Sequence, residues 1–263
     1  MKISVIGAGA MGGAMVHGML KGSTFANADI TVADPSAKAL EQFEETGATV
    51  TTDNVLAAKV SDIVAVVVKP WLVESVLKDI KQSLNYSRQL LIVVAAGVSS
   101  AQIKEWLDKG DGTMIPLFLV IPNTAISVMN SMTFVVPVGA SEEQTATVKA
   151  MFDEMGSTLI TEERLLAAGT TLASCDIAYA MRYVRAASEG GVEIGFKADD
   201  AKAIVLQTVK GAVELLQANG NHPEAEIDKV TTPGGVTIKG LNEMEHAGFT
   251  SAVIRGLKAG MKS

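Results

Sequence analysis

The pattern of apolar and polar residues divides the chain into two halves. Up to about residue 160, short apolar runs take turns with helix-compatible segments, and the longer runs show no apolar–polar alternation. Such runs are typical of parallel strands that are covered by helices on both faces. The predicted strands are Ile3–Ile6, Ile30–Ala33, Thr49–Thr51, Ile63–Val68, Leu90–Val94, Met114–Val120, Met132–Val138 and Ser157–Ile160.

The segments between these strands carry helix signals. Two of them begin with a capping box, Ser99 with Gln102 and Ser141 with Gln144, which predicts a helix start at each place. Further helices are predicted over Ala10–Leu20, Ala37–Thr46 and Val73–Gln82.

After Thr161 the chain contains helical patterns only. We therefore expect an α/β fold: a Rossmann-type, mostly parallel sheet domain over residues 1–160, followed by an all-helical domain over residues 161–263. The helical half is rich in alanine and glycine and makes a thin core, so we expect a second subunit to complete it in a homodimer or a larger homo-oligomer. Its predicted helices are 162–172, Tyr179–Gly190, Ala198–Asn219, Glu224–Val230, Ile238–His246 and Ser251–Met261.

Three glycines follow the first predicted strand with the spacing G-x-G-x-x-G. In a strand–turn–helix context this spacing is the dinucleotide-binding fingerprint. Gly7 makes the tight turn, Gly9 lets a pyrophosphate approach the backbone, and Gly12 lets the helix pack closely. The helix start, with Ala10 and Met11, offers free N–H groups to the phosphates. The alternative is a glycine-rich turn that binds nothing.

An acidic residue, Asp34, ends the second predicted strand, 22 residues beyond Gly12. A carboxylate in this position typically accepts hydrogen bonds from the adenine ribose and repels a 2′-phosphate, which favours NAD over NADP. The alternative is a helix cap with Pro35 at the first helical position, although Ser36 competes for that role.

Further residues suited to a ligand site follow other predicted strands. They are Lys69 with Pro70, Ala96 with Gly97, and Asn123. Ligands of open parallel sheets bind beyond the carboxyl ends of the strands, so we expect these residues to lie at the cofactor. For Lys69 the alternative is a solvated lysine at a strand end.

Composition and charge exclude several classes of function. The net charge of -7 leaves no basic surface for a nucleic acid. The single cysteine, Cys175, fits a reducing compartment, and we expect a soluble, cytoplasmic protein. Glycines interrupt the uncharged stretch between Lys2 and Lys21, so it is not a membrane segment. The three histidines are not spaced as metal ligands, and we expect no metal site.

A non-helical stretch, Thr231–Thr237, interrupts the helical half. Gly234 and Gly235 after Pro233 predict a sharp turn with exposed N–H groups that leads into a helix. Such a turn can bind a carboxylate. The alternative is an ordinary loop between helices.

These motifs together resemble the pyrroline-5-carboxylate reductase family. The resemblance rests on the glycine turn, Val68-Lys69-Pro70, Ala95-Ala96-Gly97-Val98, Pro122-Asn123-Thr124, the Gln207-Thr208 pair and Val230–Thr237. It implies NAD(P)H-dependent reduction of the cyclic imine pyrroline-5-carboxylate to proline, usually with NADPH, and a helical domain that interlocks with a partner subunit.

The resemblance also implies roles for single residues. Thr237 would hydrogen-bond the ring nitrogen and help to deliver the proton, while Thr232, Gly234 and Gly235 would shape the carboxylate site. At the nicotinamide end the lining residues would be Lys69, Pro70, Ala96 and Asn123.

The chain departs from the family pattern in two places. Ala173–Ala178 replaces a serine-glycine-rich run that neighbours the substrate in the family, and it brings Asp176 to that position. Asp34-Pro35-Ser36 replaces a run suited to a 2′-phosphate. The alternatives are a reductase or dehydrogenase of another small imino, amino or hydroxy acid, and a non-catalytic NAD(P)-binding redox sensor. Lys239 and Asn242, three residues apart, do not match the lysine–asparagine pair of β-hydroxyacid dehydrogenases.

Overall fold

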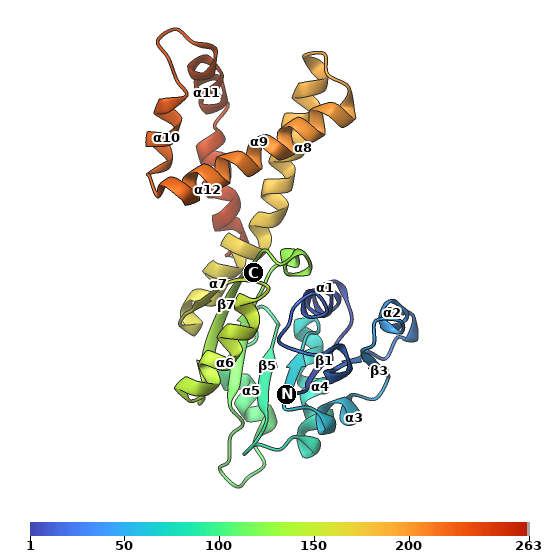
Figure 1. Cartoon of the computed structure of the whole chain (residues 1–263). Coiled ribbons are helices and arrows are strands. Elements are labelled where there is room, and N and C mark those ends of the chain that lie inside the picture. The colour runs from blue at the N-terminus through green and yellow to red at the C-terminus, as the bar shows by residue number, and fades with distance from the viewer. Residues whose placement is uncertain (262–263) are drawn as a thin grey trace. The chain divides into compact units, whose positions relative to one another are not determined.

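The chain forms two compact units, which the computed structural model describes over residues 1–261 (Figure 1). The first unit covers Met1–Ser174, and the second begins at Cys175. None of the helices within the described residues combines the length and the apolar character needed to cross a membrane.

An eight-stranded sheet, ordered β3-β2-β1-β4-β5-β6-β7-β8, forms the centre of the first unit. All neighbouring strands are parallel except β6 and β7. Only the short 3-10 helix Thr124–Val128 connects that pair, so no crossover can return the chain for a parallel pairing. The strands are β1 (Ile3–Ile6), β2 (Ile30–Ala33), β3 (Thr49–Thr51), β4 (Ile63–Val66), β5 (Leu90–Val93), β6 (Leu117–Ile121), β7 (Ser131–Val138) and β8 (Gly156–Ile160).

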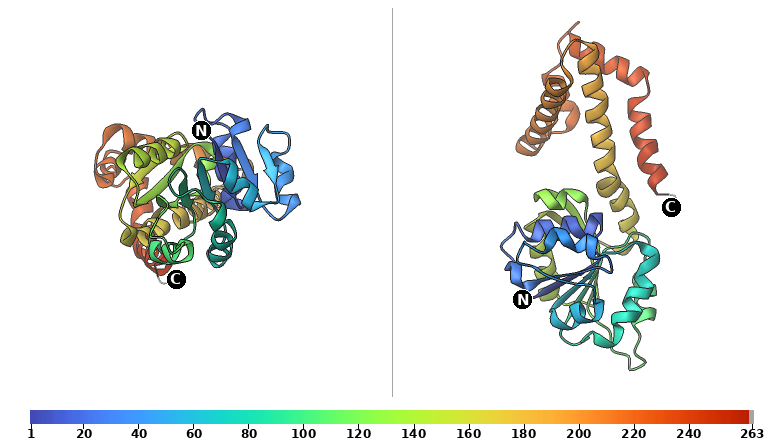
Figure 2. Two further views of the ribbon diagram at one scale, coloured as in Figure 1. Left: turned by 90° about the horizontal axis from the view of Figure 1, so that it is seen from below. Right: turned by 90° about the vertical axis from the view of Figure 1, so that its right-hand side faces the viewer.

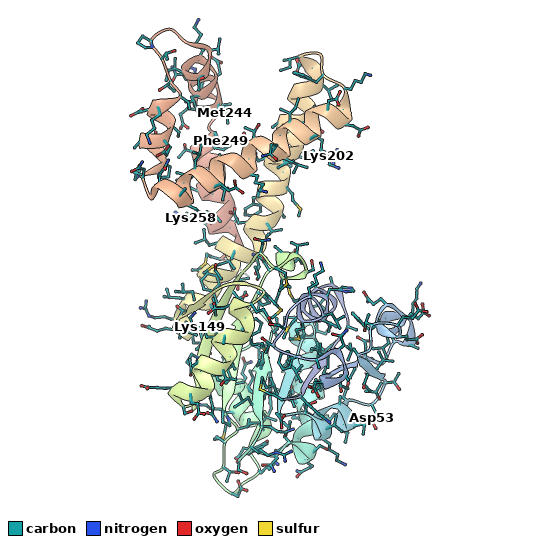
Figure 3. All side chains as sticks on the ribbon, viewed as in Figure 1. Asp53, Lys149, Lys202, Met244, Phe249 and Lys258 are labelled. Carbon is teal, nitrogen blue, oxygen red and sulfur yellow. The ribbon has the colours of Figure 1, made fainter. Side chains whose placement is uncertain are left out.

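The fold class predicted from the sequence is confirmed, and all eight predicted strands form. Some of their ends differ from the prediction. β6 begins at Leu117 rather than at Met114, because Pro116 lacks the N–H group that a strand needs. The short helix α3 (Asn54–Val60) has no counterpart in the prediction. Asp53, labelled in Figure 3, caps it by accepting a hydrogen bond from the N–H of Leu56 at 3.0 Å.

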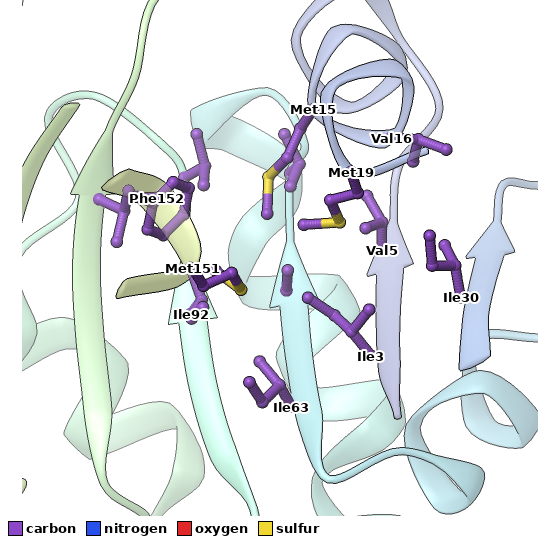
Figure 4. Packing of buried hydrophobic residues seen from close by; sticks show 14 of the residues in the cluster. Ile3, Val5, Met15, Val16, Met19, Ile30, Ile63, Ile92, Met151 and Phe152 are labelled. Carbon is purple, nitrogen blue, oxygen red and sulfur yellow. The ribbon is translucent and has the colours of Figure 1, made fainter. Parts of the chain in front are cut away.

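Helices cover both faces of the sheet. Ile3 and Val5 point to one face, where Met15 and Met19 of α1 pack together with α6, which contributes Phe152 (Figure 4). On the opposite face, apolar residues from β4, β5 and β6 pack against α3, α4 and α5. The remaining helices of this unit are α1 (Ala10–Met19), α2 (Ala37–Leu40), α4 (Pro70–Ile80), α5 (Ser100–Leu107), α6 (Glu142–Asp153) and α7 (Leu166–Gly169). Both capping boxes form as predicted.

The segment predicted as one helix over residues 162–172 is broken into three pieces. They are the 3-10 helix Glu163–Leu165, α7 and the π-helix Thr170–Cys175. Glu163 anchors this segment to the start of α5, since its carboxylate accepts hydrogen bonds from the N–H of Ser100 at 2.8 Å and from the Ser100 hydroxyl at 2.5 Å. The first compact unit therefore extends beyond residue 160, to Ser174.

The second unit consists of helices only, as predicted (Figures 1 and 2). Its two longest helices, α8 and α9, pack against each other, and α11 contacts α12. Among the described residues of this unit, Ala201 alone is fully buried, and many large apolar side chains are exposed. The helices are α8 (Asp176–Glu193), α9 (Ala198–Asn219), α10 (Pro223–Lys229), α11 (Val236–His246) and α12 (Phe249–Gly260).

A carboxylate, Glu154, joins the end of α6 to the connection between α1 and β2. It accepts hydrogen bonds from the backbone and hydroxyl of Ser23, the latter at 2.6 Å, and from the N–H of Thr24 at 3.1 Å. Burial of the carboxylate raises its pKa, but these hydrogen bonds outweigh burial and lower the pKa of Glu154 to about 2.

The lowered pKa predicts a stabilisation that depends on pH. The contribution of the Glu154 carboxylate is complete above its unfolded-state pKa of about 4.5 and is lost as the pH falls towards 2. We expect Glu154→Gln to lower the free energy of unfolding by about 1–2 kcal/mol at pH 7, because hydrogen bonds to a charged acceptor are the stronger ones.

Urea unfolding between pH 7 and pH 3 measures this effect. The difference in stability between wild type and Glu154→Gln should shrink below pH 4.5. Glu105→Gln, which changes an exposed carboxylate on α5, is the matched control and should leave the stability nearly unchanged. A difference between wild type and Glu154→Gln that stays constant over this range would contradict the assignment.

Candidate functional site

A cavity of about 470 Å³ opens at the carboxyl ends of the parallel strands. All of its lining residues belong to the first unit. They come from the carboxyl end of β6, from the segments that follow β1, β2, β4, β5 and β6, including the starts of α1 and α4, and from the π-helix. The strand ends meet at this edge because Ile6 of β1 pairs with both Ala33 of β2 and Val66 of β4. The lining residues are Gly7, Gly9, Ala10, Met11, Asp34, Val67, Val68, Lys69, Pro70, Leu72, Val94, Ala95, Ala96, Ile121, Pro122, Thr124, Thr170 and Ser174.

The glycine turn after β1 has little room for side chains at two of its three glycines. Gly7 has φ +110°, and a Cβ there would lie 2.2 Å from the carbonyl oxygen of Val67. A Cβ on Gly12 would lie 1.8 Å from the carbonyl oxygen of Gly7. Gly9 differs, since no atom lies within 4 Å of the position of its Cβ. The space over Gly9 thus fits a pyrophosphate at the start of α1.

Asp34 fastens this turn to the end of β2. One of its carboxylate oxygens accepts a hydrogen bond from the N–H of Ala8 at 2.8 Å, and the other accepts one from the N–H of Ser36 at 2.8 Å. The hydroxyl of Ser36 caps α2 by accepting from the N–H of Ala39. The capping role that was the alternative for Asp34 therefore falls to Ser36, and the Asp34 carboxylate lies in the cavity wall.

The predicted residues after β4 and β5 lie mostly at the cavity. Lys69 precedes α4, and Pro70 occupies the first helical position, where the missing N–H costs nothing. Both line the cavity, and so does Ala96. Gly12 and Gly97 do not belong to the lining.

Asn123 lies next to the cavity but does not line it. Its side chain is buried, with 5% of the residue exposed, and hydrogen-bonds to backbone groups of the protein. Its neighbours Pro122 and Thr124 belong to the lining.

Sequence reasoning assigned no role to three residues with hydroxyl side chains that also line the cavity, Thr124, Thr170 and Ser174, although it named Thr124 and Ser174 within longer motifs. For Thr124 the signal was its place directly after a strand-end asparagine. Thr170 and Ser174 belong to the π-helix. This element is only six residues long, so its sequence shows no repeating pattern of apolar residues that would predict it.

The second group of predicted residues belongs to the second unit. Gly234 has φ +72°, and the N–H of Gly235 donates to the carbonyl of Thr232 at 2.9 Å, so the predicted sharp turn is formed. α11 begins directly after Gly235, and the exposed Thr237 lies in its first turn. Asp176 is the first residue of α8 and is half-buried.

Two family models match the chain. The one described as NADP oxidoreductase coenzyme F420-dependent matches residues 2–97, and the one described as pyrroline-5-carboxylate reductase dimerisation matches residues 163–263. A pyrroline-5-carboxylate reductase of Synechocystis sp. is 33% identical over 98% of this chain and 95% of its own length. The chain belongs to the pyrroline-5-carboxylate reductase family.

Other members of the family agree with this assignment. Pyrroline-5-carboxylate reductase 1 of Dictyostelium discoideum is 38% identical over 97% of this chain, which spans only 48% of that relative's length. The crystal structure of the Plasmodium falciparum pyrroline carboxylate reductase with NADP bound is 25% identical, covers 100% of this chain and 96% of that one, and gives a TM-score of 0.90.

The room over Gly9 predicts the effect of a small substitution. We expect Gly9→Ala to fold normally but to weaken NAD(P)H binding about tenfold or more, because the new methyl group would fill the space that a pyrophosphate needs. A fluorescence titration with NADH and NADPH measures the affinity.

Gly13→Ala is the matched control in the same helix. Its Cβ would lie 3.5 Å from the Ala8 carbonyl oxygen, an ordinary contact, and alanine favours the helix. Wild-type affinity in the Gly9→Ala variant would show that no phosphate lies over this turn.

Proposed function

We propose that this chain reduces 1-pyrroline-5-carboxylate to L-proline. In this reaction NAD(P)H transfers a hydride to the imine carbon, the ring nitrogen gains a proton, and the C=N double bond becomes a single bond. The observation that carries the proposal is the cavity that runs from Asp34, past the glycine turn, to Thr170 in a chain of this family. Such chemistry depends mainly on orienting the ring against the nicotinamide.

The residues proposed to bind the cofactor form two groups, one at each end of the cavity. We propose that Gly7, Gly9, Ala10, Met11 and Gly12 form the pyrophosphate turn and that Asp34 accepts hydrogen bonds from the adenine ribose. For the nicotinamide end we propose a second group, made up of Lys69, Pro70 and Ala96 in the cavity lining, with Gly97 and Asn123 next to it.

The substrate is proposed to bind at the turn before α11. Thr232, Gly234 and Gly235 would hold the carboxylate, with support from the N–H groups at the start of the helix. Thr237 would hydrogen-bond the ring nitrogen. Asp176 is proposed to lie beside the substrate, where its negative charge favours a protonated nitrogen over a carboxylate.

The helical half is proposed to form the dimer. Its large exposed apolar side chains, including Ile194, Phe249 and Ile254, support a homodimer or a larger homo-oligomer. We propose that the cofactor domain, predicted over residues 1–160, also includes the rest of the first unit up to Ser174, that the substrate and dimerisation domain follows it, and that the protein acts in the cytoplasm.

An assay of NADH and NADPH oxidation with pyrroline-5-carboxylate tests the function. We expect turnover, with NADH preferred by about tenfold or more in kcat/KM, because the Asp34 carboxylate is fixed at the ribose end by two backbone N–H groups and repels a 2′-phosphate. A preference for NADPH would contradict the proposed role of Asp34.

A second candidate is the reduction of another small cyclic imino acid, which the altered run Ala173–Ala178 favours. The same assay with imines of different ring size separates the two functions. Absence of turnover with pyrroline-5-carboxylate and turnover with another ring would replace the proposed substrate.

The proposed role of Thr237 predicts a selective loss of turnover. We expect Thr237→Ala to lower kcat by about tenfold to a hundredfold, because the ring nitrogen loses its hydrogen-bond partner, while NAD(P)H affinity stays within about twofold. Thr237→Ser keeps the hydroxyl and should recover most of the rate. Equal losses of rate and cofactor affinity in Thr237→Ala would remove this role.

A further inference from the structure

The π-helix Thr170–Cys175 forms one wall of the cavity through two hydroxyl side chains. Thr170 donates its hydroxyl hydrogen to the carbonyl of Leu166 at 2.7 Å, and Ser174 donates its own to the carbonyl of Pro122 at 2.7 Å. A hydroxyl has one hydrogen, so both oxygens remain available only as acceptors. They suit a ligand that donates hydrogen bonds, such as the carboxamide NH₂ group of a nicotinamide.

The position of this wall depends on the chain corner after β6. Asn123 donates from its side-chain nitrogen to the carbonyl of Ala173 at 3.4 Å, while its side-chain oxygen accepts from the N–H of Ala125 at 3.0 Å. Its own N–H donates to the hydroxyl of Ser131 at 3.2 Å. Both ends of the side-chain amide therefore contact backbone, and the π-helix is joined to β7 through one buried residue.

Packing supports the same attachment. Ala173 is 8% exposed and lies in a small apolar cluster with Ile121 and Phe134. Gly169, just before the π-helix, is so close to Phe134 that a Cβ would lie 3.0 Å from its ring. The segment approaches the sheet too closely to shift without loss of contacts.

We propose that Asn123 is a positioning residue, which holds the π-helix so that the oxygens of Thr170 and Ser174 face the nicotinamide end of the cavity. It thus acts through the wall and makes no contact with the cofactor itself. The inference rests on the proposed function for its kinetic consequence, but the attachment of the π-helix can be measured without any reaction.

Two substitutions distinguish the effects of the two hydrogen bonds that the Asn123 side chain makes. Asn123→Asp keeps an oxygen that accepts from Ala125 but cannot donate to Ala173 at neutral pH, and Asn123→Ala removes both bonds. Asn130→Ala is the matched control, because Asn130 lies on the same connection, is exposed, and its side chain bonds only to the carbonyl of Val128 among the described residues.

Hydrogen exchange of the full-length protein is the first measurement. The amides of residues 170–175 should exchange at least about fivefold faster in Asn123→Asp than in wild type, and Asn130→Ala should leave them unchanged. Equal exchange in Asn123→Asp and wild type would overturn the proposal, whichever substrate the enzyme reduces. If Asn123→Ala does not fold, the Asp variant alone decides.

Kinetics and cofactor binding are the second measurement. We expect kcat for the imine to fall about tenfold in Asn123→Asp, because small misplacements at a reacting centre are costly, while the Kd for NADH stays within about twofold. A loss of NADH affinity in Asn123→Asp without faster exchange of residues 170–175 would make Asn123 a direct cofactor contact and overturn its positioning role. A wild-type protein without imine turnover would refute the proposed function only, since exchange and NADH affinity still test Asn123.

Discussion

The cavity depends on a steric constraint at the end of β1. The chain must pass between the Val67 carbonyl and the first turn of α1, and neither Gly7 nor Gly12 has space for a Cβ. Any larger residue would push α1 away from the sheet, and with it the free N–H groups that the helix directs at the cavity. Between these two tightly packed positions, no atom lies within 4 Å of the Cβ position of Gly9.

The rest of the cavity follows from the parallel register of the central strands. β1, β2 and β4 end at the same level, so the turns that follow them form one continuous edge. The sheet changes direction only between β6 and β7, and the corner at this change carries the attachment of the π-helix. The change of strand direction therefore lies beside the cavity, close to the expected nicotinamide end.

The sequence was sufficient to predict the sheet, because buried parallel strands appear as unbroken apolar runs such as Leu90–Val93. It also predicted the glycine turn and both capping boxes, since each depends on residues close together in the chain. The π-helix and the contact between Asn123 and Ala173 were missed for the opposite reason. The partners Asn123 and Ala173 lie 50 residues apart, and no local pattern marks such a contact. The hydrogen bond between Asp34 and Ala8 was missed for the same reason. Asp34 was predicted as a ribose contact, but no local pattern marks Ala8 as its partner.

The hydrogen bond between Asp34 and Ala8 links the proposed preference for NADH over NADPH to the stability of the glycine turn. The Asp34 carboxylate, which is proposed to repel a 2′-phosphate, also holds the glycine turn by accepting a hydrogen bond from the N–H of Ala8. A mutation that admits the phosphate by removing Asp34 leaves this N–H without its acceptor and loosens the turn that all dinucleotides share. The phosphate itself, or another nearby oxygen, would have to supply the missing acceptor. If Asp34 also sets the cofactor preference as proposed, a substitution at this position changes two properties at once: the contact to the ribose and the rigidity of the glycine turn.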